Sequence, residues 1–278
     1  MRVLTTPASM RNYRRRLGGS VGFVPTMGYL HDGHLALVHR AARENAHTVV
    51  SIFVNPAQFA PGEDFERYPR DEVRDLALLR EAGVAAVYLP AAADMYPRGY
   101  QTYVEVERIT RTLEGSARPG HFRGVTTVVL KLINAVEPDR AYFGRKDAQQ
   151  LRIIERMARD LDLATEIVPC EIMREPDGLA MSSRNVYLSG EQRAAAPVLY
   201  NALQEARAAF NDGERDADRL RFLVAEHLNR EPLAEIEYVS LADDRSLEEI
   251  DGRVRRPALL SIVVRFGHTR LLDNLELS

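Results

Sequence analysis

One short segment constrains the fold of this chain more than any other. Residues 48–54 read TVVSIFV, a continuous, largely apolar run rich in β-branched side chains. A strand with one exposed face alternates apolar and polar residues, whereas a strand covered on both faces is apolar throughout. Residues 35–45 and 71–82, on either side, have helical character. We therefore predict a strand of a parallel sheet that helices cover on both faces.

The same alternation runs through the first part of the chain. Further strands are predicted at residues 21–25, 84–89, 139–143 and 165–169, and further helices at 124–136 and 147–161. Alternating strands and helices are typical of an α/β domain with a Rossmann-like, doubly wound parallel sheet and right-handed crossovers. Such sheets bind ligands at the carboxyl ends of their strands. The residues that follow each strand are therefore the candidates for a functional site.

The pattern changes after the turn cluster EPDG at residues 175–178. Beyond it we predict two helices and three strands, at residues 191–210, 217–229, 235–241, 258–266 and 270–275. Helices followed by strands indicate a smaller α+β unit. The sequence thus predicts two domains, residues 1–172 and 173–278, and we expect the second to close over the site of the first.

Charge and apolar content narrow the classes of function. The net charge is −3, so no sequence-wide basic surface for nucleic acid is expected. No apolar run approaches the roughly 20 residues of a membrane helix, and residues 1–12 lack the pattern of a signal peptide. Cys170 is the single cysteine, which we interpret as buried filler rather than a nucleophile. We expect a cytoplasmic protein with no nucleic-acid or membrane partner.

The segment PTMGYLHDGH, residues 25–34, follows the first predicted strand and opens the first helix. The unpaired N–H groups of a helix N-terminus attract phosphate. His31 and His34 can donate hydrogen bonds to phosphate oxygens and stabilise charge on a leaving pyrophosphate. Two other interpretations stay open, since the histidines could be half of a zinc site or ordinary residues at a helix start.

The segment FVNPAQF follows the strand at residues 48–54. Asn55 and Gln58 place neutral hydrogen-bonding groups among apolar side chains, a combination that suits a small, partly apolar substrate. A loop with capping residues explains the same pattern equally well.

Two later segments carry cationic and hydroxyl groups. Lys146, one of only two lysines, lies in FGRKDAQQ after another predicted strand, and a flexible ammonium at a helix start suits an α-phosphate. In MSSRN, the side chains of residues 182–184 can grip a polyphosphate through charge-assisted hydrogen bonds. The alternatives are an ordinary helix cap in the first case and a common loop tripeptide in the second.

The segment RPGHFRGV, residues 118–125, brings two arginines and a histidine into a loop before a helix. Contact with a substrate carboxylate or phosphate and a solvated basic loop are equally compatible with this composition.

Taken in order, six segments make the chain resemble the pantoate–β-alanine ligase family over essentially its whole length: PTMGYLHDGH, FVNPAQF, YPRD, RPGHFRGV, FGRKDAQQ and MSSRN. The family belongs to the nucleotidyltransferases with an H-x-G-H motif. The resemblance implies that ATP and pantoate form an enzyme-bound pantoyl-adenylate and release pyrophosphate. The amine of β-alanine then attacks, giving pantothenate and AMP. The segments offer phosphate and substrate contacts but no evident nucleophile, which fits this chemistry.

The resemblance also implies roles for single residues. Pantoate is expected at Met27, Asn55, Gln58 and Gln150. Catalytic groups are expected to be His31, His34, Lys146, Ser182, Ser183 and Arg184. Within the expected ATP site, Gly144 and Asp147 lie near the ribose, and Met173 and Met181 lie near the adenine. The whole ATP site is expected to comprise Pro25, Thr26, Met27, Gly28, Gly33, His34, Phe143, Gly144, Arg145, Lys146, Asp147, Met173, Met181, Ser182, Ser183 and Arg184.

The resemblance further implies Mg²⁺, which normally accompanies ATP, and a homodimer formed through the N-terminal domain. Asp75 matches a family acidic position near Mg²⁺, but Arg74 and Leu78 stand at positions that are acidic or polar in some members. We therefore expect phosphates and water to hold most of the metal. Arg145 replaces a frequent glutamate and adds positive charge beside Lys146.

Two other functions remain in view. A nucleotidyltransferase with a stable nucleotide-linked product would need no pocket for an acyl acceptor, and FVNPAQF and the second domain argue against it. A nucleotide-binding regulator without catalysis is expected to lack one of His31, His34 or Lys146, and all three are present.

Overall fold

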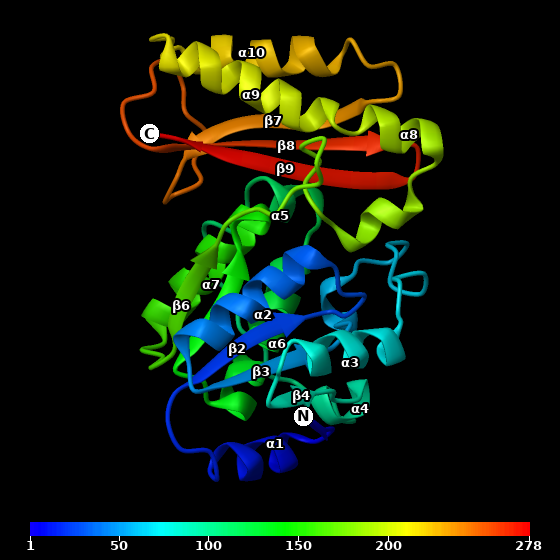
Figure 1. Cartoon of the computed structure of the whole chain (residues 1–278). Coiled ribbons are helices and arrows are strands. Elements are labelled where there is room, and N and C mark those ends of the chain that lie inside the picture. Colours follow the sequence, from blue (N-terminus) through cyan, green and yellow to red (C-terminus); the bar gives the residue numbers. More distant parts are fainter. The chain divides into compact units, whose positions relative to one another are not determined.

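The computed structural model describes all of residues 1–278 and divides into two compact units (Figure 1). Unit 1 comprises residues 1–145 and 150–171, and unit 2 comprises residues 146–149 and 172–278. The chain therefore enters unit 2 for four residues, returns to unit 1, and then enters unit 2 again.

Unit 1 contains one parallel sheet of six strands in the order β1-β4-β3-β2-β5-β6 (Figure 1). Its strands are β1 (Arg2–Leu4), β2 (Val21–Thr26), β3 (His47–Ile52), β4 (Ala86–Tyr88), β5 (Arg140–Gly144) and β6 (Glu166–Cys170). Its helices are α1 (Pro7–Arg14), α2 (Asp32–Glu44), α3 (Glu72–Glu81), α4 (Ala92–Met95), α5 (Glu114–Ala117) and α6 (His121–Val136), and α7 (Ala148–Asp160) begins in unit 2. The predicted α/β class is confirmed.

The two faces of the sheet bury separate sets of side chains. Phe23 of β2 lies in the core shared with α1 and α6, whereas Val24 lies in the core shared with α2 and α3. Val49 and Val50 of β3 divide in the same way. Both faces are covered, so Thr48 and Ser51 of the TVVSIFV segment are buried along with its apolar side chains. The strand predicted there is confirmed as β3, which ends at Ile52.

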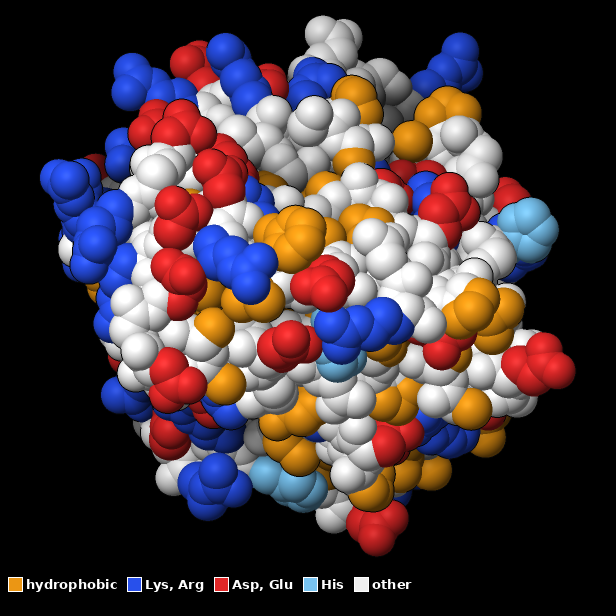
Figure 2. All heavy atoms as spheres, turned by 90° about the horizontal axis from the view of Figure 1, so that it is seen from above, with side chains coloured by type: hydrophobic (Ala, Val, Ile, Leu, Met, Phe, Trp, Pro, Cys, Tyr) orange, Lys and Arg blue, Asp and Glu red, His pale blue; other side chains and the backbone are white.

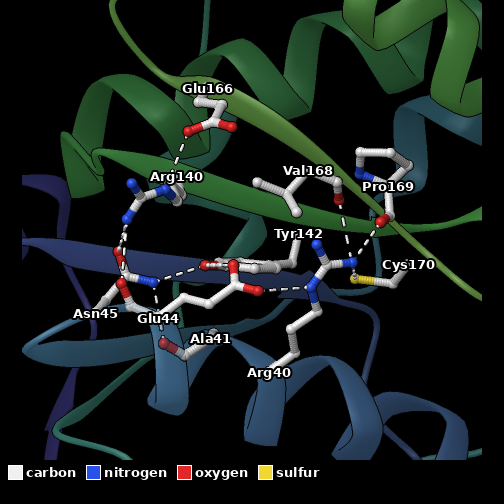
Figure 3. A network of polar contacts seen from close by, with 10 residues as sticks. All are labelled: Arg40, Ala41, Glu44, Asn45, Arg140, Tyr142, Glu166, Val168, Pro169 and Cys170. Atoms are coloured by element: carbon white, nitrogen blue, oxygen red, sulfur yellow. Dashed lines mark hydrogen bonds and ion pairs between the residues drawn. The ribbon is translucent and has the colours of Figure 1, made fainter.

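A polar network joins α2 to the two strands at one edge of the sheet (Figure 3). Glu44 accepts hydrogen bonds from Arg40 (2.9 Å) and from the hydroxyl of Tyr142 (2.8 Å). Arg40 also donates to the carbonyl of Pro169 (2.6 Å) and lies 3.7 Å from Sγ of Cys170. Burial raises the pKa of the Cys170 thiol, although Arg40 opposes the shift. The cysteine is thus a buried group of the sheet edge, and a raised pKa disfavours the thiolate that a nucleophile needs.

Unit 2 contains an antiparallel sheet in the order β7-β8-β9 with helices packed on it. Its elements are α8 (Gly190–Ala195), α9 (Val198–Asn211), α10 (Ala217–Leu228), β7 (Glu235–Asp243), β8 (Ala258–Phe266) and β9 (Thr269–Leu277). Leu203 of α9, Val224 of α10 and Ile262 of β8 belong to one buried core. The outward face of α9 and α10 carries acidic and basic side chains among small, separated apolar groups (Figure 2).

The elements differ from the prediction in several places. The short helices α4 and α5 have no counterpart in it, and α2 begins at Asp32, three residues before the predicted start. The helix expected at residues 191–210 is two helices, because Pro197 between them has no N–H for a continuous helix. Helix α6 begins at His121, three residues before the predicted start. Strand β1 and helix α1 have no counterpart in the prediction. No helix has the length and apolar character needed to cross a membrane.

Candidate active site

Residues 27–34, which connect β2 to α2 and include the first residues of α2, are named here the histidine loop. Gly28 and Tyr29 both have positive φ, +82° and +50°, a conformation that is costly for tyrosine. The buried carboxylate of Asp75 accepts the N–H of Tyr29 (2.7 Å) and of Leu30 (2.8 Å), and Thr26 accepts that of Gly28 (3.2 Å). Burial raises the pKa of Asp75, and the two N–H groups oppose that shift. The strained backbone is therefore held by three hydrogen bonds at its start.

The two histidines cap α2 reciprocally. Nδ1 of His31 accepts the N–H of Gly33 (3.2 Å), and Nδ1 of His34 accepts the N–H of His31 (3.4 Å). The ring centroids are 4.0 Å apart. Because each Nδ1 is an acceptor, a neutral ring carries its proton on Nε2, which makes Nε2 a hydrogen-bond donor. No third metal-ligating side chain joins the pair, so the arrangement suits an anion better than zinc.

The turn that follows β3, residues 55–58, is named here the amide turn, and it includes the 3₁₀ helix Pro56–Gln58. Asn55 is 1% exposed; its Nδ2 donates to Oε1 of Gln58 (3.0 Å), and its Oδ1 accepts the hydroxyl of Tyr96 (2.8 Å). Nε2 of Gln58 donates to Sδ of Met27 (3.2 Å). The structure thus brings together three of the four residues predicted to hold pantoate, and both amides have fixed orientations.

The carboxyl end of β5 supplies further predicted residues. Phe143 is buried, and Gly144 ends the strand. Arg145 forms an ion pair with Glu171 (3.3 Å), which balances part of the charge it adds beside Lys146. Gln150, the fourth predicted pantoate residue, is the third residue of α7. Because β5 neighbours β2, these residues follow a strand end at the same edge of the sheet as the histidine loop.

Unit 2 contains a hollow that is lined by cationic side chains. Lys146, Ser182 and Arg184 line it, together with Arg270 and Asp273 of β9. Lys146 is attached to β9 because Asn274 Nδ2 donates to the Lys146 carbonyl (2.7 Å).

The single carboxylate in the hollow is already neutralised. Asp273 is 1% exposed on its side chain and pairs with Arg174 through two contacts of 2.6 and 3.0 Å. Arg270 pairs with Glu237 (2.8 Å), and Asp147 lies 3.9 Å from the Lys146 ammonium. The hollow is therefore cationic on balance and suits a phosphate group.

The MSSRN segment begins a short 3₁₀ helix, Ser183–Tyr187. Oγ of Ser182 caps it by accepting the N–H of Arg184 (3.2 Å), and Ser183 is buried. The N–H of Met181 donates to the carbonyl of Met173 (3.0 Å). The two methionines expected near the adenine therefore belong to neighbouring stretches of backbone, and Met173 is 40% exposed.

Sequence reasoning missed several residues at these sites, among them Tyr96, Arg270 and Asp273. Tyr96, whose hydroxyl orients Asn55, lies 41 residues away from it in the chain. Arg270 lies on β9, outside every recognised motif. None of them has a local sequence signal, because only the fold brings them to their partners.

A family model described as Pantoate-beta-alanine ligase matches residues 2–276. This chain belongs to the pantoate–β-alanine ligase family. The pantothenate synthetase of Herpetosiphon aurantiacus is 55% identical over 99% of both chains. That of Roseiflexus castenholzii is 56% identical over 99% of this chain and 98% of the relative.

Solved structures give the same result. The crystal structure of pantothenate synthetase from Thermus thermophilus has a TM-score of 0.93 and 49% identity, and the match covers 99% of each chain. The pantoate–β-alanine ligase from Francisella tularensis, complexed with Beta-gamma ATP and β-alanine, has a TM-score of 0.82 and 32% identity and covers 99% of this chain and 97% of that chain. The family resemblance and the fold class expected from the sequence are both confirmed.

Proposed function

We propose that this chain condenses pantoate with β-alanine at the expense of ATP, with the residues described above in the roles given below. The reaction is that of its family. The carboxylate of pantoate attacks the α-phosphorus of ATP and expels pyrophosphate. The amine of β-alanine then attacks the acyl carbon of the pantoyl-adenylate and expels AMP. No enzyme nucleophile is required, so the protein contributes positioning and charge stabilisation.

The observation that carries the assignment is the contact between the histidine loop and the amide turn. Gln58 donates to Met27, so a ligand bound by the amides of Asn55 and Gln58 lies beside the loop that bears the histidines. Amides recognise hydroxyl and carboxylate groups, and the thioether of Met27 contacts apolar carbon. We assign pantoate to Met27, Asn55, Gln58 and Gln150.

The phosphates of ATP are assigned to two sets of donors. In unit 1, Nε2–H of His31 and of His34 bind and stabilise negative charge. In unit 2, the phosphate contacts are Lys146, Ser182, Ser183 and Arg184, three of which line the cationic hollow. The ribose and adenine are assigned to Gly144, Asp147, Met173 and Met181. The other ATP contacts are assigned to the backbone of Pro25, Thr26, Gly28, Gly33, Phe143 and Arg145.

We propose that Mg²⁺ reaches the site bound to ATP and is held by phosphate oxygens and water. Asp75, the acidic residue that the family resemblance offers for the metal, does not fit a ligand. Its side chain is 1% exposed, and its two oxygens accept the N–H groups of Tyr29 and Leu30. No cluster of three or more His, Cys, Asp or Glu side chains forms a metal site elsewhere.

We further propose a cytoplasmic homodimer that forms through unit 1. The proposal follows from the family resemblance and from a composition with a single, buried cysteine. Size-exclusion chromatography with light scattering measures the assembly, and a mass of one chain of 31.3 kDa at micromolar concentration contradicts it.

Exchange of labelled pyrophosphate into ATP tests the first step alone. Exchange is expected with pantoate and Mg²⁺ in the absence of β-alanine, because adenylate formation is reversible. Addition of β-alanine should convert the adenylate to pantothenate and AMP. Exchange that proceeds equally well without pantoate contradicts the substrate assignment, and would favour a nucleotidyltransferase with a different acceptor.

A further inference from the structure

Within the RPGHFRGV segment, Pro119, Gly120 and Arg123 are exposed, whereas Arg118 and His121 make contacts within unit 1. The guanidinium of Arg118 binds the carboxylate of Glu63 through two contacts, Nε to Oε1 at 2.6 Å and Nη2 to Oε2 at 2.5 Å. Both side chains are largely buried, at 14% and 22% exposed. Although burial opposes the shift, Arg118 lowers the pKa of Glu63. The pair is therefore a fixed, ionised unit and not a solvated loop.

His121 links this ion pair to the amide turn. Nδ1 of His121 lies 2.7 Å from the backbone carbonyl of Gln58, and Nε2 lies 3.2 Å from Nη1 of Arg118. A guanidinium can only donate, so Nε2 is the acceptor and the ring proton sits on Nδ1, from which it is donated to the Gln58 carbonyl. Burial and the neighbouring Arg118 lower the pKa of His121 to about 4. The imidazole is thus neutral at physiological pH, in a single tautomer.

Helix α6 also touches the amide turn directly. The carbonyl of Gly124 accepts Nδ2 of Asn55 (3.1 Å). A Cβ atom on Gly124 would lie 2.2 Å from the carbonyl oxygen of Ala57 and 2.7 Å from the N of Gln58. Only glycine permits this approach, so the first turns of α6 contact the amide turn along its backbone.

The amide turn depends on side chains for support because its backbone-to-backbone hydrogen bonds are long. The N–H of Gln58 reaches the carbonyl of Asn55 at 3.4 Å, and that of Phe59 reaches the carbonyl of Pro56 at 3.3 Å. Hydrogen bonds of this length contribute little. The 2.7 Å contact from His121 is much shorter, and it acts on the residue that ends the turn.

We infer that Glu63, Arg118 and His121 form a positioning relay that fixes Gln58 for pantoate. The relay runs from the carboxylate through the guanidinium to the imidazole and ends on the Gln58 backbone, while Asn55 and Met27 hold the Gln58 side chain. None of the three relay residues touches substrate. Their function is to set the position of the Gln58 amide, and the inference rests on the proposed role of Gln58 in binding pantoate.

Two matched substitutions of His121 distinguish the role of Nδ1 from that of Nε2. In His121→Asn, the amide nitrogen takes the place of Nδ1 and can still donate to the Gln58 carbonyl. In His121→Gln, the amide reaches toward Arg118, and the Gln58 carbonyl loses its 2.7 Å donor and keeps only the 3.4 Å contact from Nη2 of Arg118. We expect KM for pantoate to rise about tenfold in His121→Gln, as for loss of one hydrogen bond. His121→Asn should recover most of that loss, and KM for ATP should stay unchanged in both.

The control is His47→Phe, which removes another contact between a histidine and a backbone carbonyl. Nε2 of His47 lies 2.9 Å from the carbonyl of Gly18, at the amino end of β3 and away from the amide turn. Its kinetic constants should match those of the wild type. Thermal unfolding of each variant shows whether a kinetic change reflects loss of the fold.

Nitrogen-15 NMR of the His121 ring tests the relay without reference to activity. We expect the neutral Nδ1–H tautomer from about pH 5 to about pH 9, with Arg118, Glu63 and Glu114 as the charged groups around the ring. An Nε2–H tautomer, or equal pantoate KM values in the Asn and Gln variants, overturns the relay. If Gln58→Ala leaves pantoate KM unchanged while the tautomer is as expected, the proposed role of Gln58 fails instead.

Discussion

Gly124 offers the sharpest test of how closely the amide turn must be held. In Gly124→Ala, the new methyl carbon would lie 2.2 Å from the carbonyl oxygen of Ala57, a separation that real Cβ atoms do not show. The nearest acceptable separation is 3.0 Å, so the helix or the turn must retreat by about 1 Å. A misplacement of that size at a reacting centre costs about 10²-fold in rate, or about 2.7 kcal/mol. Asn55 and Gln58 should move with the turn.

The assay is kcat/KM for pantoate at saturating ATP and β-alanine, with unfolding measured in parallel. Alanine is favoured over glycine in a helix by about 1 kcal/mol, which offsets part of the clash, so activity should fall more than stability. Gly190→Ala is the control, since that glycine also lies in a helix and has no heavy atom within 4 Å of an added Cβ. A Gly124→Ala enzyme with wild-type kcat/KM would refute the view that this close approach fixes the amide turn.

Three further predictions concern other parts of the site. Asp75→Asn should lower the free energy of unfolding, measured in urea, by about 1–3 kcal/mol, because an amide N–H then faces a backbone N–H. If the variant instead needs more Mg²⁺ and its stability is unchanged, Asp75 is a metal ligand. His31→Ala and Lys146→Ala should each reduce pyrophosphate exchange about 10²- to 10³-fold, and near-normal exchange in both would remove them from the chemistry. Because the pKa of Glu63 is lowered in the folded state, its stabilising effect is present above its usual value of 4.5 and is lost as the pH falls through the lowered value. The stability difference between the wild type and Glu63→Gln should therefore shrink in acid, and a difference that persists at about pH 2 would argue against the ion pair.

Sequence patterns predicted the buried strands well because covering both faces of a sheet leaves a strong local signature. The TVVSIFV run at β3 and the segment 258–266 at β8 are almost entirely buried, and both strands were located from composition alone. Strand β1 is only three residues long and partly exposed, so it has no periodicity to detect. The break at Pro197 could have been predicted from the missing N–H.

The site was less predictable because its decisive contacts join distant parts of the chain. Motifs placed the histidine loop and the amide turn after their strands, but the contact between Asp75 and Leu30 spans 45 residues. The segment RPGHFRGV remained ambiguous because Glu63, which neutralises Arg118, lies 55 residues earlier. No local pattern contains both members of such a pair.

The brief entry of residues 146–149 into unit 2 limits how this protein can be dissected. Lys146 belongs to unit 2 and is attached to Asn274, whereas Gly144 belongs to the sheet of unit 1. If the chain were cut at residue 172, the N-terminal piece would keep Lys146 but lose β9, whose Asn274 binds the Lys146 carbonyl. The C-terminal piece would keep the rest of the hollow but lack the Lys146 ammonium. Each unit is therefore compact in space but discontinuous in sequence. A single cut before residue 172 leaves unit 1 with all of its residues but deprives unit 2 of residues 146–149.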